Sequence, residues 1–158
     1  MLASLEPRHR EKLVSLLEAT TEFNKEDVTV ALELIDIALG DPSANDYRFI
    51  VYEDQDQSDV LGYACFGATP MTEGCFDLYW LVVAPAARRG GVARELLGAV
   101  EQALRRHHAR LVRVETAGLD SYAAARSLYQ KAGYECAARL RDFYHPGNDL
   151  CIYTKYLA

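Results

Sequence analysis

Apolar positions in the first forty residues recur at spacings of three and four, which is the pattern of amphipathic helices. Leu13, Leu16 and Leu17 mark one such stretch. Asn24, which has a typical N-cap side chain, precedes a second. The chain is therefore expected to open with two helices joined by a tight turn around Phe23. The elements predicted here are a short edge strand at Met1–Leu5, a helix from Pro7 to Thr20, and a helix from Asn24 to the closing Gly40-Asp41-Pro42.

The apolar runs that follow are short, aromatic and β-branched, as is typical of strands. The polar stretch Glu53–Asp59 separates the first two runs and predicts a hairpin loop. Ala84-Pro85 is expected to end the third run, because proline cannot donate a backbone hydrogen bond. The predicted strands are Tyr47–Tyr52, Val60–Phe66 and Cys75–Val83.

The second half of the chain alternates between helical and strand patterns. Apolar residues four positions apart, from Val92 to Leu104, mark one face of a long helix. A further helix is expected to be capped by Asp120 or Ser121 and to run to about Ala132. The remaining predicted elements are strands at Leu111–Thr116, Tyr134–Leu140 and Leu150–Leu157, with a turn at His145-Pro146-Gly147-Asn148.

The resulting order of elements is β-α-α-β-β-β-α-β-α-β-β, which predicts an α/β fold with a mixed sheet and helices on its faces. No internal repeat, low-complexity tract or linker interrupts the sequence. Because 158 residues is close to the usual size of one domain, residues 1–158 are expected to form a single domain. A chain of this length buries about 70% of the surface that its unfolded form exposes, so it needs neither a metal nor disulfides for stability.

The charge balance limits the classes of partner. The chain carries 17 Lys and Arg residues against 23 Asp and Glu residues, a formal net charge of −6. Nucleic acids and anionic membranes favour excess positive charge, so neither is expected as a partner, whereas a cationic amine suits the negative field. The sequence shows no N-terminal signal pattern and no apolar run of about 18 residues, so a cytoplasmic protein without a membrane segment is expected.

Cysteine and histidine are few and show no metal-ligand spacing, so no metal site is expected. All four cysteines fall in strand-like apolar stretches and are interpreted as small buried hydrophobic residues. The histidines lie in helix or turn contexts that indicate surface positions. The cysteines are Cys65, Cys75, Cys136 and Cys151, and the histidines are His9, His107, His108 and His145.

The segment Leu81–Ala93 is the most informative stretch of the sequence. A strand runs into the turn Arg88-Arg89-Gly90-Gly91, and the turn runs into the N-terminus of a helix. Free backbone N–H groups and the helix dipole favour an anion there, and glycine lets a phosphate approach the backbone. The pattern is neither a Walker loop, because no Gly-Lys-Ser/Thr follows, nor a G-x-G-x-x-G fingerprint. A pyrophosphate-binding turn and a solvated basic turn are the two interpretations of these residues alone.

Two motifs make the sequence resemble the GNAT superfamily of N-acetyltransferases. The first, Arg88-x-x-Gly91-x-Ala93 after a strand that ends Val82-Val83-x-Pro85, is similar to the signature that cradles the CoA pyrophosphate in that superfamily. The second, Ala125-x-x-Leu128-Tyr129-x-x-x-Gly133-Tyr134, resembles its helix-then-strand segment. The block Asp77-Leu78-Tyr79-Trp80 and the tail Arg141–Asp149 resemble a bacterial subgroup of the superfamily. The predicted element order also fits this fold, so the resemblance spans nearly the whole chain.

The resemblance implies that acetyl-CoA is the co-substrate and assigns contacts to it from both motifs. One position departs from the pattern, since many relatives carry Asn where this chain has Tyr122. The backbone of Leu81–Val83 would supply the oxyanion donor, in a strand that relatives splay from its parallel neighbour. The implied contacts to acetyl-CoA are Leu81, Val82, Val83, Arg88, Arg89, Gly90, Gly91, Val92, Ala93, Tyr122, Ala125 and Tyr129.

Acetyl transfer from a thioester to an amine requires a base for the amine proton and an acid for the leaving thiolate. Asp77 is the first candidate base, because related enzymes often place a Glu at that point; the alternative is a structural carboxylate. Glu115 is the rival base, unless it forms an ion pair with Arg113. Tyr129 is the candidate acid, since the resemblance puts it near the cofactor sulfur and a phenol of pKa near 10 stays protonated at neutral pH. A helix residue that faces the core is the other interpretation of Tyr129.

We therefore expect an acetyl-CoA-dependent N-acetyltransferase that acetylates a primary amine of a small molecule or peptide by direct attack. A non-catalytic acyl-CoA-binding regulatory module is the alternative, and a nucleotide-phosphate binder unrelated to CoA is a third interpretation. Many relatives dimerise through sheet edges, so the resemblance leaves room for a homodimer. The residues expected to line the acceptor pocket are Phe23, Asn24, Asp77, Tyr79, Asp142 and Tyr144.

Overall fold

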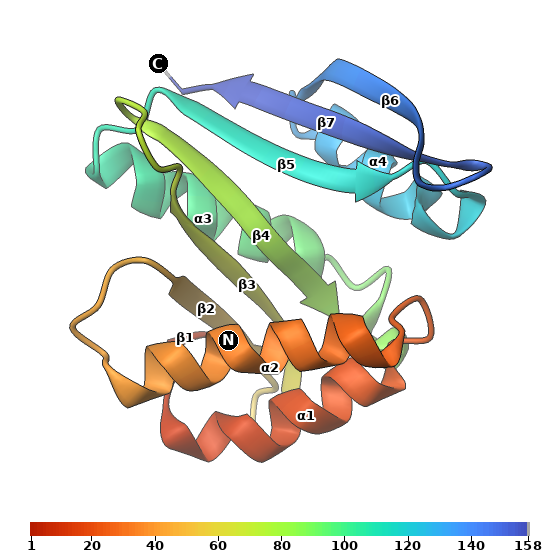
Figure 1. Ribbon diagram of the computed structural model, residues 1–158. Coiled ribbons are helices and arrows are strands. Elements are labelled where there is room, and N and C mark those ends of the chain that lie inside the picture. Colours follow the sequence, from red (N-terminus) through yellow and green to blue (C-terminus); the bar gives the residue numbers. More distant parts are fainter. Residues whose placement is uncertain (158) are drawn as a thin grey trace. The chain divides into compact units, whose positions relative to one another are not determined.

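The computed structural model describes residues 1–157, which form an α/β fold with the predicted order of elements (Figure 1). Three short 3₁₀ helices, at Pro7–His9, Pro85–Ala87 and Asp120–Tyr122, precede the helices α1, α3 and α4. The helices are α1 Arg10–Ala19, α2 Lys25–Gly40, α3 Val92–Arg106 and α4 Ala123–Lys131. The strands are β1 Leu2–Ser4, β2 Arg48–Glu53, β3 Val60–Ala68, β4 Cys75–Val83, β5 Leu111–Ala117, β6 Glu135–His145 and β7 Asn148–Tyr156.

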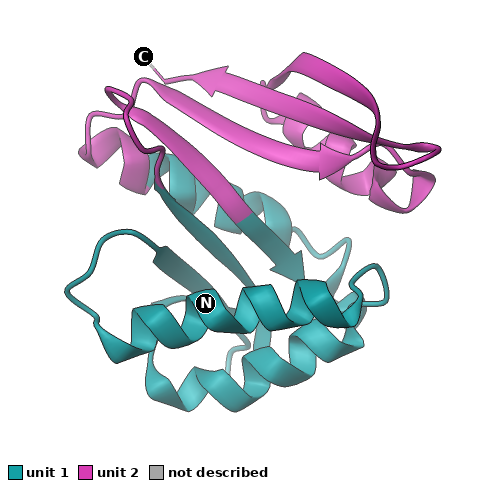
Figure 2. Cartoon of the chain, in the orientation of Figure 1, with its two compact units in different colours: residues 1–67, 80–102 teal, residues 68–79, 103–158 magenta. Residues whose placement is uncertain are grey.

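The strands belong to a mixed sheet, as predicted, because one pair is parallel and the others with a recorded register are antiparallel. The chain divides into two compact units (Figure 2). Unit 1 comprises Met1–Gly67 and Trp80–Gln102, and unit 2 comprises Ala68–Tyr79 and the described residues from Ala103 on. The strand β4 begins in unit 2 and ends in unit 1. The expectation of a single domain over residues 1–158 stays a prediction.

The core of unit 1 is built by α1 and α2 against β2 and β3. Leu13, Leu17, Ile35 and Val51 are fully buried in it. The predicted N-cap of α2 is confirmed, because the Asn24 side chain accepts a hydrogen bond from the backbone N–H of residue 27 at 2.8 Å. The leucine spacing in the sequence therefore identified the buried face of α1 correctly.

One glycine of β3 is required by close packing in unit 1. A Cβ at Gly62 would lie 2.7 Å from the carbonyl oxygen of Val82 and within 3.3 Å of Val92 and Leu96. Only glycine therefore lets β3 approach the end of β4 and the first turns of α3 this closely. This contact fixes where the strand end meets the helix that follows the basic turn.

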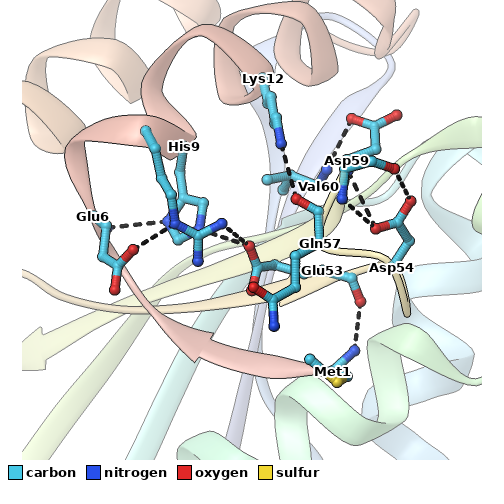
Figure 3. A network of polar contacts seen from close by, with 11 residues as sticks. Met1, Glu6, His9, Lys12, Glu53, Asp54, Gln57, Asp59 and Val60 are labelled. Carbon is cyan, nitrogen blue, oxygen red and sulfur yellow. Dashed lines mark hydrogen bonds and ion pairs between the residues drawn. The ribbon is translucent and has the colours of Figure 1, made fainter.

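A buried polar network in unit 1 corrects two of the sequence predictions (Figure 3). His9 was expected at the surface and Glu53 in a loop, but His9 is 0% exposed and Glu53, the last residue of β2, is 2% exposed. The backbone N–H of Glu6 donates to Nδ1 of His9 at 3.0 Å, so Nε2 carries the proton and donates to Oε1 of Glu53 at 3.0 Å. Arg8 also pairs with Glu53, and this hydrogen bond, more than the one from His9, lowers the pKa of the Glu53 carboxyl. Burial of both side chains is tolerated because each finds a polar partner.

The sheet of unit 2 runs in the order β4, β5, β7, β6, with α4 packed against its C-terminal strands. The predicted cap of α4 by Asp120 or Ser121 is wrong. These residues form a 3₁₀ turn, and Tyr122 is the N-cap residue, without a side-chain hydrogen bond. The guanidinium of Arg126 instead donates to the backbone oxygens that precede this turn, at 2.7 and 2.8 Å.

The strand β6 is exposed along all eleven of its residues and extends to His145, five residues beyond the predicted end. Its pairing with β7 shifts register between Leu140 and His145 and resumes at His145, which pairs with Asn148. Cys136 lies on this strand and is exposed, so its predicted burial is wrong. Cys75 is only partly buried, whereas Cys65 and Cys151 are buried as predicted. No helix in residues 1–157 is long and apolar enough to cross a membrane.

Candidate functional site

The basic turn of unit 1, Arg88-Arg89-Gly90-Gly91, lies between the end of β4 and the first turn of α3 (Figure 1). Two of its residues have left-handed backbone conformations, Arg89 with φ +69° and Gly91 with φ +86°. The N–H of Glu95 donates a hydrogen bond to the carbonyl oxygen of Gly91 at 3.0 Å. This helical backbone hydrogen bond links the first turn of α3 to the basic turn. The N–H groups that precede this bond, those of residues 92 to 94, are the ones a helix leaves without an intrahelical partner. With the helix dipole they favour an anion at this end of α3.

The space beside Gly91 fits a close-approaching ligand. A Cβ built there would meet no atom nearer than Nη2 of Arg94, at 3.7 Å. The glycine is therefore required by its positive φ and not by a protein neighbour. The open backbone at this point leaves room for a ligand, and the role of Gly91 in a phosphate cradle stays a prediction.

The two arginines of the turn differ in their surroundings. Arg88 forms a bidentate ion pair with Glu22, with Nη1–Oε1 at 2.8 Å and Nη2–Oε2 at 3.1 Å, and this pairing lowers the pKa of Glu22. Sequence reasoning missed Glu22, because nothing local indicates a partner 66 positions away. Arg89 is exposed and has no hydrogen bond or ion pair within residues 1–157. Arg89 is therefore the turn cation that remains available to a ligand.

The other predicted residues of unit 1 have packing or capping contacts. Val82 is buried in the core, and its neighbours Leu81 and Val83 are partly buried. The ring of Phe23 packs edge-on against Trp80, with centroids 5.3 Å apart. Asn24 caps α2. The predicted acceptor-lining residues of unit 1 therefore have structural roles whether or not they also meet a substrate.

In unit 2, Asp77 lies on β4 with its side chain almost fully engaged. Its Oδ1 accepts a hydrogen bond from Nε of Arg113 at 2.6 Å, and its Oδ2 accepts one from Oγ1 of Thr69 at 2.8 Å. Asp77 is 7% exposed, and its hydrogen bond raises the pKa of the Arg113 guanidinium. These contacts are those of a structural carboxylate. A base must also be within reach of the substrate, and Asp77 is nearly buried with each oxygen accepting a hydrogen bond, whereas an exposed carboxylate is more accessible.

Glu115 lies two residues beyond Arg113 on β5 and is exposed. Its Oε1 is 3.9 Å from Nη1 of Arg113, which is an ion-pair distance but longer than a hydrogen bond. The structure therefore brings both candidate bases beside the guanidinium of Arg113. Of the two carboxylates, only that of Glu115 is exposed.

Tyr129 lies on α4 within a group of three tyrosines in unit 2. Its ring centroid is 5.7 Å from that of Tyr134 and 5.9 Å from that of Tyr153. Tyr129 is buried, and burial raises the pKa of its phenol. The phenol is therefore protonated throughout the neutral range. Tyr122 and Ala125, the other two cofactor candidates of unit 2, are partly buried at the start of α4.

The remaining acceptor candidates belong to unit 2. Tyr79 is exposed on β4. Asp142 shapes the β6–β7 hairpin, because its Oδ1 accepts from the N–H of Gly147 at 2.8 Å and its own N–H donates to Asp149 at 3.0 Å. Tyr144 is exposed beside Phe143. In residues 1–157 no group of three or more His, Cys, Asp or Glu side chains is placed to hold a metal ion.

The comparisons with known proteins identify the family of the chain. The "Acetyltransferase (GNAT) domain" family matches residues 45–136. A crystal structure of a putative acetyltransferase of the GNAT family from Desulfovibrio desulfuricans is 38% identical, with a TM-score of 0.92 over 100% of this chain and 99% of that chain. The chain belongs to the GNAT acetyltransferase family and is an N-acetyltransferase. Members of this family use acetyl-CoA.

More distant structures share the fold. A ribosomal-protein-alanine N-acetyltransferase from Brucella melitensis is 20% identical, with a TM-score of 0.77 over 99% of each chain. An aminoglycoside 6'-N-acetyltransferase complexed with coenzyme A is 16% identical, with a TM-score of 0.77 over 99% of this chain and 96% of that chain. No match was found among curated protein sequences.

Proposed function

We propose that this N-acetyltransferase takes acetyl-CoA as co-substrate and transfers the acetyl group to a primary amine of a small molecule or peptide by direct attack. The observation that carries the proposal is the turn before α3, where Gly91 adopts φ +86° next to open space and Arg89 has no partner in the described chain. This turn suits a pyrophosphate, which the amides of Gly91–Ala93 and the Arg89 guanidinium would hold. Arg88 would act mainly through Glu22, as a brace of the turn.

The contacts of the two carboxylates favour Glu115 as the base. Asp77 would serve to orient Arg113, because both of its oxygens accept hydrogen bonds. Glu115 is exposed and lies 3.9 Å from the same guanidinium, so its carboxylate is accessible to an incoming ammonium group and would accept its proton. Asp77 remains the second candidate.

Tyr129 would supply the proton that the leaving thiolate needs. Burial keeps the Tyr129 phenol protonated. Packing against the rings of Tyr134 and Tyr153 fixes the orientation of the Tyr129 ring. The backbone of Leu81–Val83 is a further proposed contact to the co-substrate. The others are Tyr122, the N-cap residue of α4, and Ala125 in the first turn of that helix.

Two similar structures support an amine acceptor, since one is an enzyme named for the alanine of a ribosomal protein and the other for an aminoglycoside. A non-catalytic CoA-binding module is not favoured by membership of an acetyltransferase family. A homodimer stays a prediction.

The proposed function is tested by two measurements on the full chain. Isothermal titration with acetyl-CoA is expected to give micromolar binding. Release of free CoA, followed with a broad panel of primary amines, is expected to exceed hydrolysis for at least one amine, with an N-acetyl product of the corresponding mass. Binding of acetyl-CoA without transfer to any amine in the panel would favour the non-catalytic module instead.

A further inference from the structure

One face of β5 in unit 2 carries charged side chains, whereas its other face is buried. Val112 and Val114 are buried at 0% and 4% exposure, and Arg113 and Glu115 alternate with them. Side chains two residues apart on a strand project from the same face, so Arg113 and Glu115 are displayed together. Cross-strand register continues this face onto Asp77 of β4 and Thr154 of β7, which both pair with Arg113.

The guanidinium of Arg113 is held in a fixed orientation with part of its donor set unused. Its Nε donates to Asp77, and Asp77 is in turn held by Thr69. Neither Nη1 nor Nη2 has a hydrogen-bond partner within residues 1–157, and the side chain is 39% exposed. The protein therefore orients the outer edge of the guanidinium, formed by Nη1 and Nη2, but the described residues supply no hydrogen-bond acceptor to it.

An oriented guanidinium edge matches a carboxylate. Two parallel N–H donors bind the two oxygens of a carboxylate in a bidentate arrangement, which is stronger and more specific than a single charge contact. Glu115 stands 3.9 Å from Nη1, so a negative group lies directly beside this carboxylate-binding edge. A ligand with a carboxylate next to an ammonium group has the complementary pair of charges.

We propose that the acceptor is a zwitterionic amino acid, whose carboxylate binds Nη1 and Nη2 of Arg113 and whose amino group faces Glu115. The inference rests on the proposed function and narrows its substrate class. In the reaction, Glu115 takes one proton from the ammonium group and releases it to solvent, and the amine nitrogen bonds to the acetyl carbon. The nitrogen then loses a second proton to Glu115, the carbon–sulfur bond of the thioester breaks, and the thiolate takes the Tyr129 proton. The products are an N-acetyl amino acid, CoA and one proton in solvent, and the second proton on Glu115 replaces that of Tyr129 through solvent.

The test compares matched acceptors that differ only in the carboxylate. The full set of free amino acids, their carboxamides and the corresponding decarboxylated amines are compared by kcat/KM in the CoA-release assay. The wild-type protein is expected to prefer the free acid to its amide by about tenfold or more, which corresponds to about 1.4 kcal/mol. In Arg113→Lys, which keeps the charge but removes the two-donor edge, that preference is expected to fall to within about threefold, since the lysine ammonium binds as a point charge.

Arg10→Lys is the matched control. Arg10 also pairs with a carboxylate through Nε, at 2.6 Å from Asp36, and its side chain is 44% exposed, but it lies on α1 of unit 1. This variant is expected to keep the wild-type preference. Thermal unfolding of both variants shows whether a change in rate reflects loss of fold.

The outcomes separate this inference from the proposed function. The inference is overturned if amides or simple amines are acetylated at rates equal to those of the acids, or if Arg113→Lys leaves the preference for acids unchanged. Either result leaves the N-acetyltransferase proposal intact. Absence of transfer to every amine overturns the proposed function. In that case, the ¹⁵Nη signals of Arg113 decide the carboxylate site alone: they are expected to shift saturably on titration with amino acids but not with their amides, and no shift with any amino acid contradicts the site.

Discussion

Nε of Arg113 lies 2.6 Å from Oδ1 of Asp77, and the pair joins neighbouring positions of the parallel strands β4 and β5. The sequence placed an acidic residue at the point where related enzymes often have a catalytic one, but this carboxylate is bound on both oxygens. We therefore propose that Asp77 orients the Arg113 guanidinium and that the exposed Glu115 beside it is the base.

The first prediction separates the two carboxylates. Glu115→Gln is expected to lower kcat/KM by about 10²-fold or more, because a positioned base contributes about 10²–10⁴-fold. Asp77→Asn is expected to raise KM for the acceptor more than it lowers kcat, since it loosens Arg113 without removing the base. Steady-state kinetics of both variants checks this. A loss of kcat in Asp77→Asn with little effect of Glu115→Gln would return the base assignment to Asp77.

The second prediction concerns Gly91. Gly91→Val is expected to weaken acetyl-CoA binding by about tenfold or more, because a branched residue at φ +86° is strained and its side chain fills the space that a phosphate would use. Gly98→Ala, on the exposed side of α3 with nothing within 4 Å, is the control and is expected to leave binding unchanged. Isothermal titration measures both. Full retention of affinity in Gly91→Val would refute the cradle.

The third prediction concerns the phenol of Tyr129. Tyr129→Phe is expected to lower kcat by about 10²-fold while acetyl-CoA affinity stays within a few-fold. Because burial raises the pKa of this phenol above its ordinary value of 10.0, its proton is present at every lower pH and is lost only above that value. The activity deficit of the variant should therefore be constant from pH 6 to about 9. A variant with wild-type turnover across this range would exclude Tyr129 as the acid.

The fourth prediction concerns the stability of unit 1. Glu53→Gln is expected to lower the free energy of unfolding by about 1–3 kcal/mol, because it weakens the hydrogen bonds of the buried carboxylate to the exposed Arg8 and the buried His9. Asp36→Asn removes an exposed pair with Arg10 and is expected to cost less than about 1 kcal/mol. Urea unfolding of both variants at neutral pH tests the difference, and equal losses would contradict the account.

The pH dependence of that stability follows from Glu53. Its folded-state pKa is lowered below the ordinary value of 4.5, so the stabilisation is fully present above 4.5 and is lost as pH falls through the folded-state value. The difference in unfolding free energy between the wild type and Glu53→Gln should therefore shrink as the pH is lowered below 4.5. A difference that stays constant to pH 3 would show that the carboxylate charge does not contribute.

Features set by neighbouring residues could be predicted from the sequence. The spacing of leucines in α1, the cap at Asn24 and the glycine-rich turn before α3 are local, and the structure has each where the sequence indicates it. The predicted cap at the start of α4 is the local prediction that was wrong. Asp120 lies in a 3₁₀ turn, and the guanidinium of Arg126 from the helix itself binds the carbonyl groups there.

Features that depend on partners far apart in the chain could not be predicted. His9 and Glu53 are 44 positions apart, and each becomes a satisfied buried group only because the other is present. Arg88 and Glu22 are 66 positions apart, and their pairing changes which arginine of the turn is available. Asp77 and Arg113 are 36 positions apart, so the distinction between a base and a structural carboxylate requires the register of β4 against β5.

We propose that the acetyl group moves directly from acetyl-CoA to an amine, without an acetylated protein intermediate. Single-turnover mixing of the protein with [1-¹³C]acetyl-CoA and an acceptor, followed by mass spectrometry of protein and products, tests it most directly. Label is expected to appear only in an N-acetyl product, at the rate at which free CoA appears, and no acetylated protein is expected to accumulate with or without acceptor. Label that first appears on the protein and then passes to the amine, or CoA release without any labelled amide, would contradict it.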